Sequence, residues 1–386
     1  MFPVGRAATI AELTAGPHPL LARLRATEPV SWLPELDGWL VTRYDLAVRV
    51  MRDAATFTVD DPRFSTAQVV GPSMLSLDGA EHARHRAAFA GYFRPREVAD
   101  RYDAFVAART RELVDRLRPA GRAELRRELA GPLAVAVMAW SLGLPGDATD
   151  RMLGWYDAIV AAVDDISAGR QPGPAADAAV GELRGSVTTS VEYGRSALLT
   201  EAATALDLPE VFSNAAVLMF GGIETTEGMT ANVVAHLLGH PDQLALVERD
   251  RSLVPVAVEE SLRLEPAAAV VDRYAVRDVA LGDARIRQGD LVRVSLTGAN
   301  RDPAVFGDPD TFDVRRTNLR QQLAFAHGPH FCVAADLARL QARTVVETVL
   351  DRLPGLRLDS PAVPRGLVFR KPTAVNVRWR PDTDRG

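Results

Sequence analysis

The 386-residue chain has a single cysteine, Cys332, and a single lysine, Lys371. One cysteine excludes an internal disulfide framework. No stretch of 18 residues is continuously apolar and the first residues carry no apolar run, so the sequence indicates neither a membrane anchor nor a signal peptide and predicts a cytoplasmic protein. The net charge of −5 is spread over the chain, which gives no reason to expect nucleic-acid binding.

Apolar residues make up 47% of the chain, enough for a large core, and no linker-like segment divides it. We therefore expect one domain over residues 1–386. Apolar periodicity predicts helices at residues 10–25, 44–51, 78–93, 100–118, 123–143, 147–166, 177–200, 208–238 and 255–264, with a flexible break at 167–174. Short strands are predicted at 30–33 and 39–42 (joined through Asp37-Gly38), at 276–286 and 291–297, and in a terminal hairpin of 366–369 with 374–378. Residues 56–72 have turn residues and no period, which predicts a long irregular loop.

Cys332 stands out because of its position. It follows a Gly-Pro turn and comes just before the amphipathic run 337–350. A sulfur at the start of a helix faces unpaired N–H groups and the positive end of the helix dipole, which favours the thiolate. A thiolate is a soft metal ligand and also a nucleophile. The alternative is that Cys332 is only a small buried hydrophobic residue.

The centre of the predicted helix over 208–238 contains Gly221 and Gly222, followed by Glu224 and Thr225. Each glycine inside a helix costs about 1 kcal/mol relative to alanine. Two adjacent glycines therefore indicate either close helix packing or a kink, or a widened turn that leaves a groove for a ligand. We favour the widened turn.

Four motifs in order resemble those of the cytochrome P450 family, and the resemblance extends from Asp78 to the C-terminus. Phe325-x-x-Gly328-x-His330-x-Cys332 is similar to the haem-binding loop, although the family usually has glycine where this chain has Ala326 and Ala334. The others are His82-x-x-x-Arg86, Gly222-x-Glu224-Thr225 and Glu260-x-x-Arg263. The last is completed by Arg316 in the segment 306–316, which also matches the family. The bacterial, soluble, ferredoxin-dependent members are the expected type.

The resemblance implies the P450 fold, a mostly α, helical haem-enclosing domain with small peripheral β-sheets. The cofactor would be haem b, placed between the helix around Gly222 and the Cys332 loop. The family's residue roles then fall on five groups: Cys332 as iron ligand; His82, Arg86, Arg273 and His330 on the propionates; Glu224 and Thr225 in proton delivery; Glu260, Arg263 and Arg316 as a structural triad; and Leu218, Gly222, Val270, Val271 and Val368 in the substrate pocket.

The implied activity is insertion of one oxygen atom from O2 into an apolar or aromatic small molecule, as in secondary-metabolite tailoring. Without a reductase domain, electrons from NAD(P)H would come through a ferredoxin reductase and a ferredoxin. Arg339 and Arg343 are candidates for the docking face, although they fit an ordinary solvated surface equally well. Two alternatives remain: a peroxide-driven haem enzyme, and a non-catalytic family relative that assists another enzyme.

Overall fold

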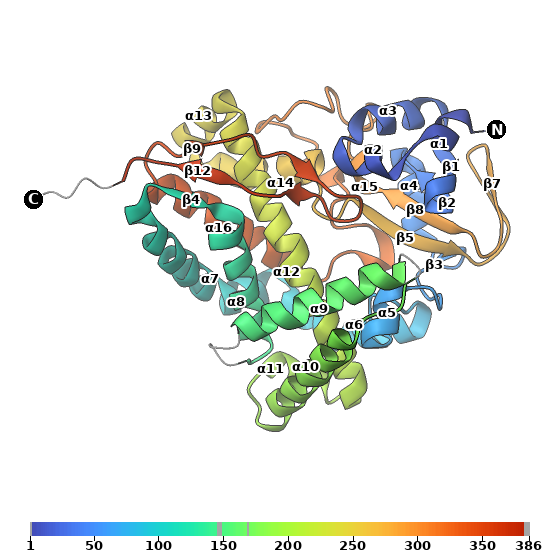
Figure 1. Ribbon diagram of the computed structural model, residues 1–386, viewed down its shortest axis with the longest axis horizontal. Helices are drawn as coiled ribbons and strands as arrows, with labels where there is room; N and C mark the ends of the chain where they lie inside the picture. The colour runs from blue at the N-terminus through green and yellow to red at the C-terminus, as the bar shows by residue number, and fades with distance from the viewer. Residues whose placement is uncertain (1, 145–148, 168–169, 382–386) are drawn as a thin grey trace, which may run out of the picture.

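Helix α12 (Leu208–Gly239) runs diagonally through the middle of the structure (Figure 1). The structure is a computed structural model that describes residues 2–144, 149–167 and 170–381. α12 begins with a capping box, in which Asp207 and Glu210 each accept a hydrogen bond from the other's backbone N–H. Most of its residues are buried on all sides, and it contacts α8, α14 and α16. A helix that is apolar all round belongs in the core of a large protein.

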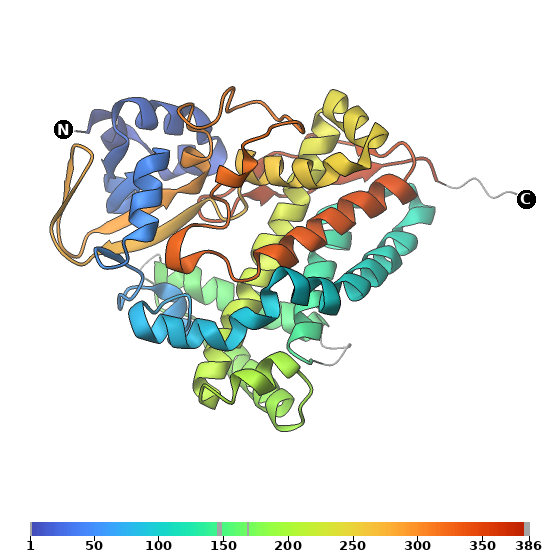
Figure 2. The same ribbon diagram turned by 180° about the vertical axis from the view of Figure 1, so that it is seen from behind.

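The other helices surround α12. They are α1 (Pro3–Ala7), α2 (Ile10–Ala15), α3 (His18–Thr27), α4 (Tyr44–Arg52), α5 (Ser65–Val70), α6 (Gly79–Ala90), α7 (Pro95–Leu117), α8 (Gly131–Ser141), α9 (Thr149–Ser167), α10 (Pro174–Glu192), α11 (Ala197–Ala202), α13 (Pro241–Arg249), α14 (Val254–Leu264), α15 (Leu296–Ala299) and α16 (Ala335–Arg352). α1 to α4 lie to one side of α12, and α7 and α16 lie to the other (Figures 1 and 2). None of the helices in the described ranges has the length and apolar character needed to cross a membrane.

The main sheet lies on the side of the N-terminal helices (Figure 1). Its strand order is β1-β2-β8-β5-β3, and only the β2–β8 pair is parallel. These strands are β1 (Val30–Leu33), β2 (Gly38–Val41), β3 (Phe57–Thr58), β5 (Val270–Ala275) and β8 (Leu291–Ser295). β1 and β2 form the expected hairpin, in which Asp37 has the left-handed conformation with φ 45°.

Three smaller sheets complete the described structure. They are β6 (Val279–Leu281) with β7 (Ala284–Ile286), β10 (Pro364–Arg365) with β11 (Lys371–Pro372), and β12 (Asn376–Arg378) between β4 (Arg122–Glu124) and β9 (Arg357–Leu358). The mostly α fold with small peripheral sheets is therefore confirmed.

Several short elements differ from the prediction. The single helix over 10–25 is two helices, because Gly16-Pro17 interrupts it. The irregular loop over 56–72 contains β3 and α5. The helix over 123–143 begins with strand β4 and a π-helical turn before α8.

Three other segments also differ. The helix over 177–200 ends at Glu192, and Gly194 adopts φ 60° before α11. The strand over 291–297 turns into α15 after Ser295. The terminal hairpin is wrong, because β12 pairs with β4 and β9 instead. Residues 147–148 of one predicted helix and 168–169 of the predicted break lie outside the described residues.

Candidate active site

The loop before α16 holds Cys332 in a defined backbone conformation. The Cys332 N–H donates a 2.9 Å hydrogen bond to the Phe325 carbonyl. Gly328 has φ 74°, and a Cβ there would lie 2.5 Å from the Met51 carbonyl oxygen of α4. This position therefore requires glycine on two grounds, conformation and space.

The two alanines that depart from the family pattern behave differently. Ala326 adopts φ 60°, a left-handed conformation that costs a residue with a side chain about 1–2 kcal/mol. Ala334 has φ −104° and ψ 22°, which needs no glycine. The loop thus forms with both alanines, and only Ala326 is strained.

The pKa of the Cys332 thiol is raised from its usual value. Burial raises it more than the Ala334 backbone hydrogen bond and the charges of Arg86 and Arg339 lower it. The Ala334 backbone hydrogen bond favours the thiolate, as the position of Cys332 predicts, but burial outweighs this contribution to the pKa. A bound metal cation reverses this balance, because a coordinating thiol loses its proton.

Two buried side chains, those of His82 and Arg273, have unused nitrogen atoms. Among the described residues, His82 Nε2 and Arg273 Nη2 are buried nitrogen atoms without a hydrogen-bond partner. Burial lowers the pKa of His82 to about 4 and that of Arg273 to about 10. Buried donors without partners are costly, so they indicate an anionic or polar group that is held there when bound.

Arg86 and His330 lie beside these donors. Arg86 Nη2 donates a 2.7 Å hydrogen bond to the Phe331 carbonyl, which joins α6 to the cysteine loop. The His330 ring packs on the His82 ring, with centroids 4.3 Å apart. The structure thus brings His82, Arg86 and His330 to the neighbourhood of Cys332. Arg273 lies within reach of the charge of Asp78, which bonds His330. This donor set fits a ligand with two carboxylates and a thiolate-bound metal, as haem b has.

Asp78 is a residue of this neighbourhood that the sequence analysis did not assign. It occupies the N-cap position of α6, but its side chain makes no capping bond. Its carboxylate instead bonds His330 Nε2 at 2.8 Å and the Thr58 hydroxyl at 2.6 Å. Burial opposes the charged form, yet these hydrogen bonds lower the pKa of Asp78 to about 2. Asp78 therefore orients His330 and ties β3 to the cysteine loop.

Helix α12 is continuous through its glycine pair. A Cβ at Gly222 would lie 2.4 Å from Met138 Sδ of α8, so close helix packing accounts for this glycine. The widened turn is therefore wrong, whereas the place of Gly222 in the substrate pocket stays a prediction. Gly221 is different, because open space lies where its Cβ would be.

The Glu224 carboxylate and the Thr225 hydroxyl have different interaction partners and lie on different sides of α12. Thr225 Oγ1 donates a 2.6 Å hydrogen bond to the Gly221 carbonyl. Glu224 accepts a hydrogen bond from the Tyr156 hydroxyl of α9 and pairs with Lys371 Nζ at 2.8 Å. Successive helical residues point about 100° apart, since a turn takes 3.6 residues. The structure therefore does not bring the two side chains into direct contact.

Glu260, Arg263 and Arg316 form one buried cluster. Glu260 accepts two hydrogen bonds from Arg263, at 2.7 and 2.8 Å, and both side chains are fully buried. Arg316 Nε lies 3.1 Å from both Glu260 oxygens. The two arginines also donate to backbone carbonyls of the segment 300–311. The cluster thus fastens α14 to the long irregular segment that precedes the cysteine loop.

The remaining pocket candidates lie on three elements. Leu218 is buried in α12, and Val368 is exposed in the bend after β10. Val270 and Val271 are successive residues of β5, so they face opposite sides of the sheet. Val271 packs against the hydrophobic cluster of the main sheet. The assignment of these four side chains to the substrate pocket stays a prediction.

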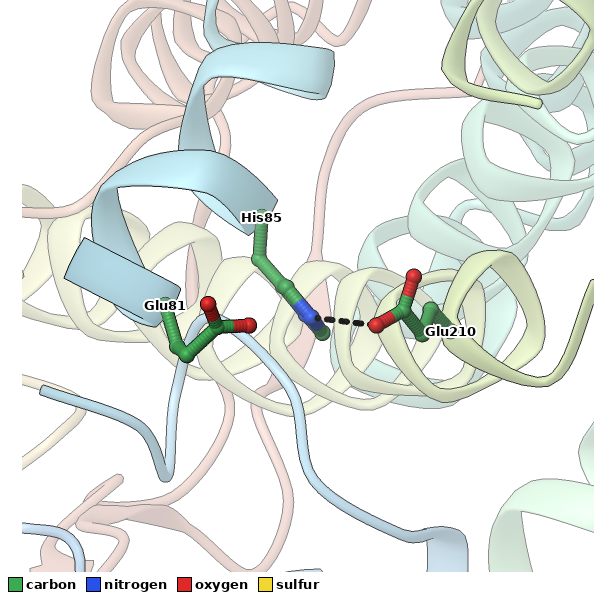
Figure 3. A group of neighbouring side chains, drawn as sticks. All are labelled: Glu81, His85 and Glu210. Carbon is green, nitrogen blue, oxygen red and sulfur yellow. Dashed lines mark ion pairs between the residues drawn. The ribbon is translucent and has the colours of Figure 1, made fainter. Parts of the chain in front are cut away.

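A second group of titratable side chains, Glu81, His85 and Glu210, lies where α6 meets the start of α12 (Figure 3). Their ligand atoms are within 4.8 Å of one another, as a metal site requires. However, the Arg84 guanidinium donates to Glu81 at 2.7 Å and to Glu210 at 2.5 and 3.0 Å. The Arg84 cation already pairs with both carboxylates, so this cluster is an ion-pair network.

The fold and the cysteine site together define a haem-thiolate enzyme, and the comparisons with known proteins agree. The family model described as cytochrome P450 matches residues 196–354. Cytochrome P450 monooxygenase PikC of Streptomyces venezuelae is 35% identical over 407 aligned residues, which cover 97% of this chain and 94% of the relative. The mycinamicin IV hydroxylase/epoxidase of Micromonospora griseorubida is 34% identical over 376 residues, with 92% and 94% covered. The crystal structure of CalO2 has a TM-score of 0.88 at 27% identity and covers 99% of each chain.

The chain belongs to the cytochrome P450 family. It is a cytochrome P450 monooxygenase, and its cofactor is haem b. The non-catalytic alternative is thereby set aside.

Proposed function

We propose that this monooxygenase inserts one oxygen atom into an apolar or aromatic small molecule in the tailoring of a secondary metabolite. When bound, haem b supplies the activation of O2 and the oxygen insertion. The mycinamicin IV hydroxylase/epoxidase is a relative with an activity of this kind. The observation that carries the proposal is the open space at Gly221, one helical turn from Thr225 on the same face of α12.

The apolar character of the substrate is supported by side chains from three elements. Phe220 of α12 packs against Tyr156 of α9, with ring centroids 6.3 Å apart, and against Phe369, at 5.6 Å. Val368 is exposed beside Phe369. Ligand pockets are mainly apolar, with a few polar groups that fix orientation. Thr225 is the polar group on this open face.

The chain's own residues hold the cofactor and supply protons. Cys332 ligates the iron, and His82, Arg86, Arg273 and His330 bind the propionates. Arginine suits carboxylates because its guanidinium donates two parallel hydrogen bonds. Thr225 offers a hydroxyl that both donates and accepts at the open face. Glu224 passes protons inward from a neighbouring side of α12.

Electrons come from NAD(P)H through a ferredoxin reductase and a ferredoxin. Arg339 and Arg343 of α16 belong to the proposed docking face. Arg339 is engaged with Glu259 at 2.6 Å, whereas Arg343 is more exposed and lies 3.8 Å from Glu347. Arg343 is therefore the better candidate for direct contact with an acidic ferredoxin.

A spectral titration of the haem-loaded protein tests the substrate class. The panel is mycinamicin IV, a steroid, a long-chain fatty acid and a small phenol, each followed by mass spectrometry of the products. We expect at least one apolar compound to shift the Soret band saturably and to gain one oxygen atom when ferredoxin and its reductase are present. Product formed only with added hydrogen peroxide would favour the peroxide-driven alternative. No binding or oxidation of any apolar compound would contradict the proposed substrate class.

A further inference from the structure

The only lysine of the chain lies between two glutamates of α12. Lys371 Nζ is 2.8 Å from Glu224 Oε2 and 2.7 Å from Glu227 Oε2. The three side chains are between 10% and 14% exposed. A single ammonium group is thus shared by two nearly buried carboxylates.

The network continues at both ends. Arg126 Nε lies 2.9 Å from Glu227 Oε1, and the Tyr156 hydroxyl bonds Glu224. The order is Arg126, Glu227, Lys371, Glu224 and Tyr156. Positive and negative groups alternate along it, so each carboxylate has a cation and Lys371 has two anions. The members come from the π-helical turn, α12, β11 and α9.

The backbone around Lys371 is anchored independently of its side chain. Arg370 Nε donates to Glu265 at 2.6 Å, and Asn232 of α12 donates to the Arg370 carbonyl at 3.0 Å. On the other side, Arg126 Nη1 donates to the Thr373 carbonyl at 2.8 Å. Substitution of the Lys371 side chain therefore leaves the position of β11 supported.

We propose that Lys371 is a positioning residue that holds the Glu224 carboxylate. We further propose that Glu227 lets Lys371 release Glu224 reversibly. The inference rests on the proposed proton-delivery role of Glu224. In the arrangement described, Lys371 and Tyr156 hold the Glu224 carboxylate away from the Thr225 hydroxyl. When Glu224 turns toward the reacting side, Lys371 keeps Glu227 as its partner, so no nearly buried cation is left alone. Arg126 in turn balances Glu227.

Amine labelling tests the arrangement without turnover, because Lys371 is the only side-chain amine. The haem-loaded protein is treated with an N-hydroxysuccinimide ester, and labelling at residue 371 is followed by peptide mass spectrometry. The reference is Arg365→Lys, which places an exposed amine on the strand residue paired with Lys371. We expect Lys371 to react at least tenfold more slowly than this reference, and Glu224→Gln or Glu227→Gln to raise its rate severalfold. Equal rates at the two positions would overturn the proposal.

The carbon monoxide stretching band of the reduced haem complex tests the effect on Glu224, because carbon monoxide senses nearby charge. We expect Lys371→Met to shift or split the band, since Glu224 is no longer held, and Lys371→Arg to restore the wild-type band. A purely structural role for Lys371 would not make the band depend on this charge. An unchanged band in a haem-loaded Lys371→Met protein would overturn the inference. Failure of the wild-type protein to form the thiolate-type complex would instead overturn the proposed function.

Glu227→Gln provides a second variant in case Lys371→Met does not take up haem. Lys371 then has Glu224 as its only ionised partner, so release of Glu224 becomes harder. We expect the wild-type carbon monoxide band together with a severalfold lower turnover of an accepted substrate. Wild-type turnover in Glu227→Gln would contradict the proposal that Glu227 lets Lys371 release Glu224.

Discussion

Gly328 is the residue whose backbone most directly shapes the cysteine loop. A Gly328→Ala substitution adds the left-handed penalty of about 1–2 kcal/mol and places a Cβ against the Met51 carbonyl. We expect the protein to lose much of its haem. Gly194→Ala is the matched control, because Gly194 has φ 60° with open space around its Cβ position. Haem content and thermal unfolding of both variants check this; equal haem content in the two would contradict it.

A second prediction for a single residue concerns the mechanism and the hydroxyl of Thr225. Thr225→Ala removes the hydroxyl from the open face of α12 while the helix remains intact. We expect haem binding and substrate affinity to stay near wild type, while electrons are consumed and oxygen leaves as hydrogen peroxide. Thr225→Ser is the control and should keep most of the coupling. The measurement is product and peroxide formed per NAD(P)H oxidised, and an equally well coupled Thr225→Ala would show that the hydroxyl has no such role.

The role of a residue could be predicted from the sequence where a motif identifies it. It could not be predicted where the role depends on packing against other elements. Cys332 and Arg86 follow from motifs, and the structure places the Arg86 guanidinium beside the cysteine loop. The reason for Gly222 did not follow, because it lies in the Met138 side chain of another helix. The role of Asp78 was also hidden, because its carboxylate bonds His330, which lies 252 residues further along the chain.

At the scale of the elements, charged side chains fasten the irregular segment 300–311 to α14. These side chains are Glu260, Arg263 and Arg316. Arg263→Ala removes two of the hydrogen bonds to the buried Glu260, which keeps Arg316, and leaves several backbone carbonyls without their donor. Breaking a buried pair by removing one partner costs about 3–5 kcal/mol. We therefore expect insoluble or haem-free protein. Arg315→Ala, at an exposed neighbouring arginine, is the control; a normally folded, haem-loaded Arg263→Ala protein would contradict the structural role.

Long elements were predicted better than short ones. α12 shows its apolar residues over 32 positions, and its ends agree with the prediction within one residue. The strands β9 to β12 have two or three residues each, too few for a period to be visible. Their pairing depends on distant partners, as when β12 lies between β4 and β9. Such long-range pairing cannot be read from local sequence.

For the whole molecule, Glu265 joins segments that are far apart in the chain. Its carboxylate contacts His18 at 2.9 Å, Arg370 at 2.6 Å and Arg301 at 3.8 Å. Burial opposes ionisation, but the His18 hydrogen bond and these positive charges lower the pKa of Glu265 from 4.5 to about 2. The folded state therefore binds this proton less readily than the unfolded state. The resulting stability is present above pH 4.5 and is lost as the pH falls toward 2.

The expected size of this effect is roughly 3 kcal/mol, because each pKa unit corresponds to about 1.4 kcal/mol. Glu265→Gln should lower the free energy of unfolding at neutral pH and weaken its dependence on pH below 4.5. Denaturant unfolding at a series of pH values measures this. Glu248→Gln, at an exposed carboxylate, is the control. An unchanged pH dependence in Glu265→Gln would contradict the assignment. A single cooperative transition in the same experiment would also support the prediction of one domain.

The central claim is that Cys332 binds the iron of haem b as a thiolate. The most direct measurement is the absorption spectrum of the reduced, carbon monoxide-treated protein, recorded for wild type and for Cys332→Ala. The account predicts a Soret band shifted to the red in wild type, as thiolate ligation requires, and loss of that band in Cys332→Ala. A well-folded wild-type protein that is colourless, or whose band is unaffected by Cys332→Ala, would contradict it.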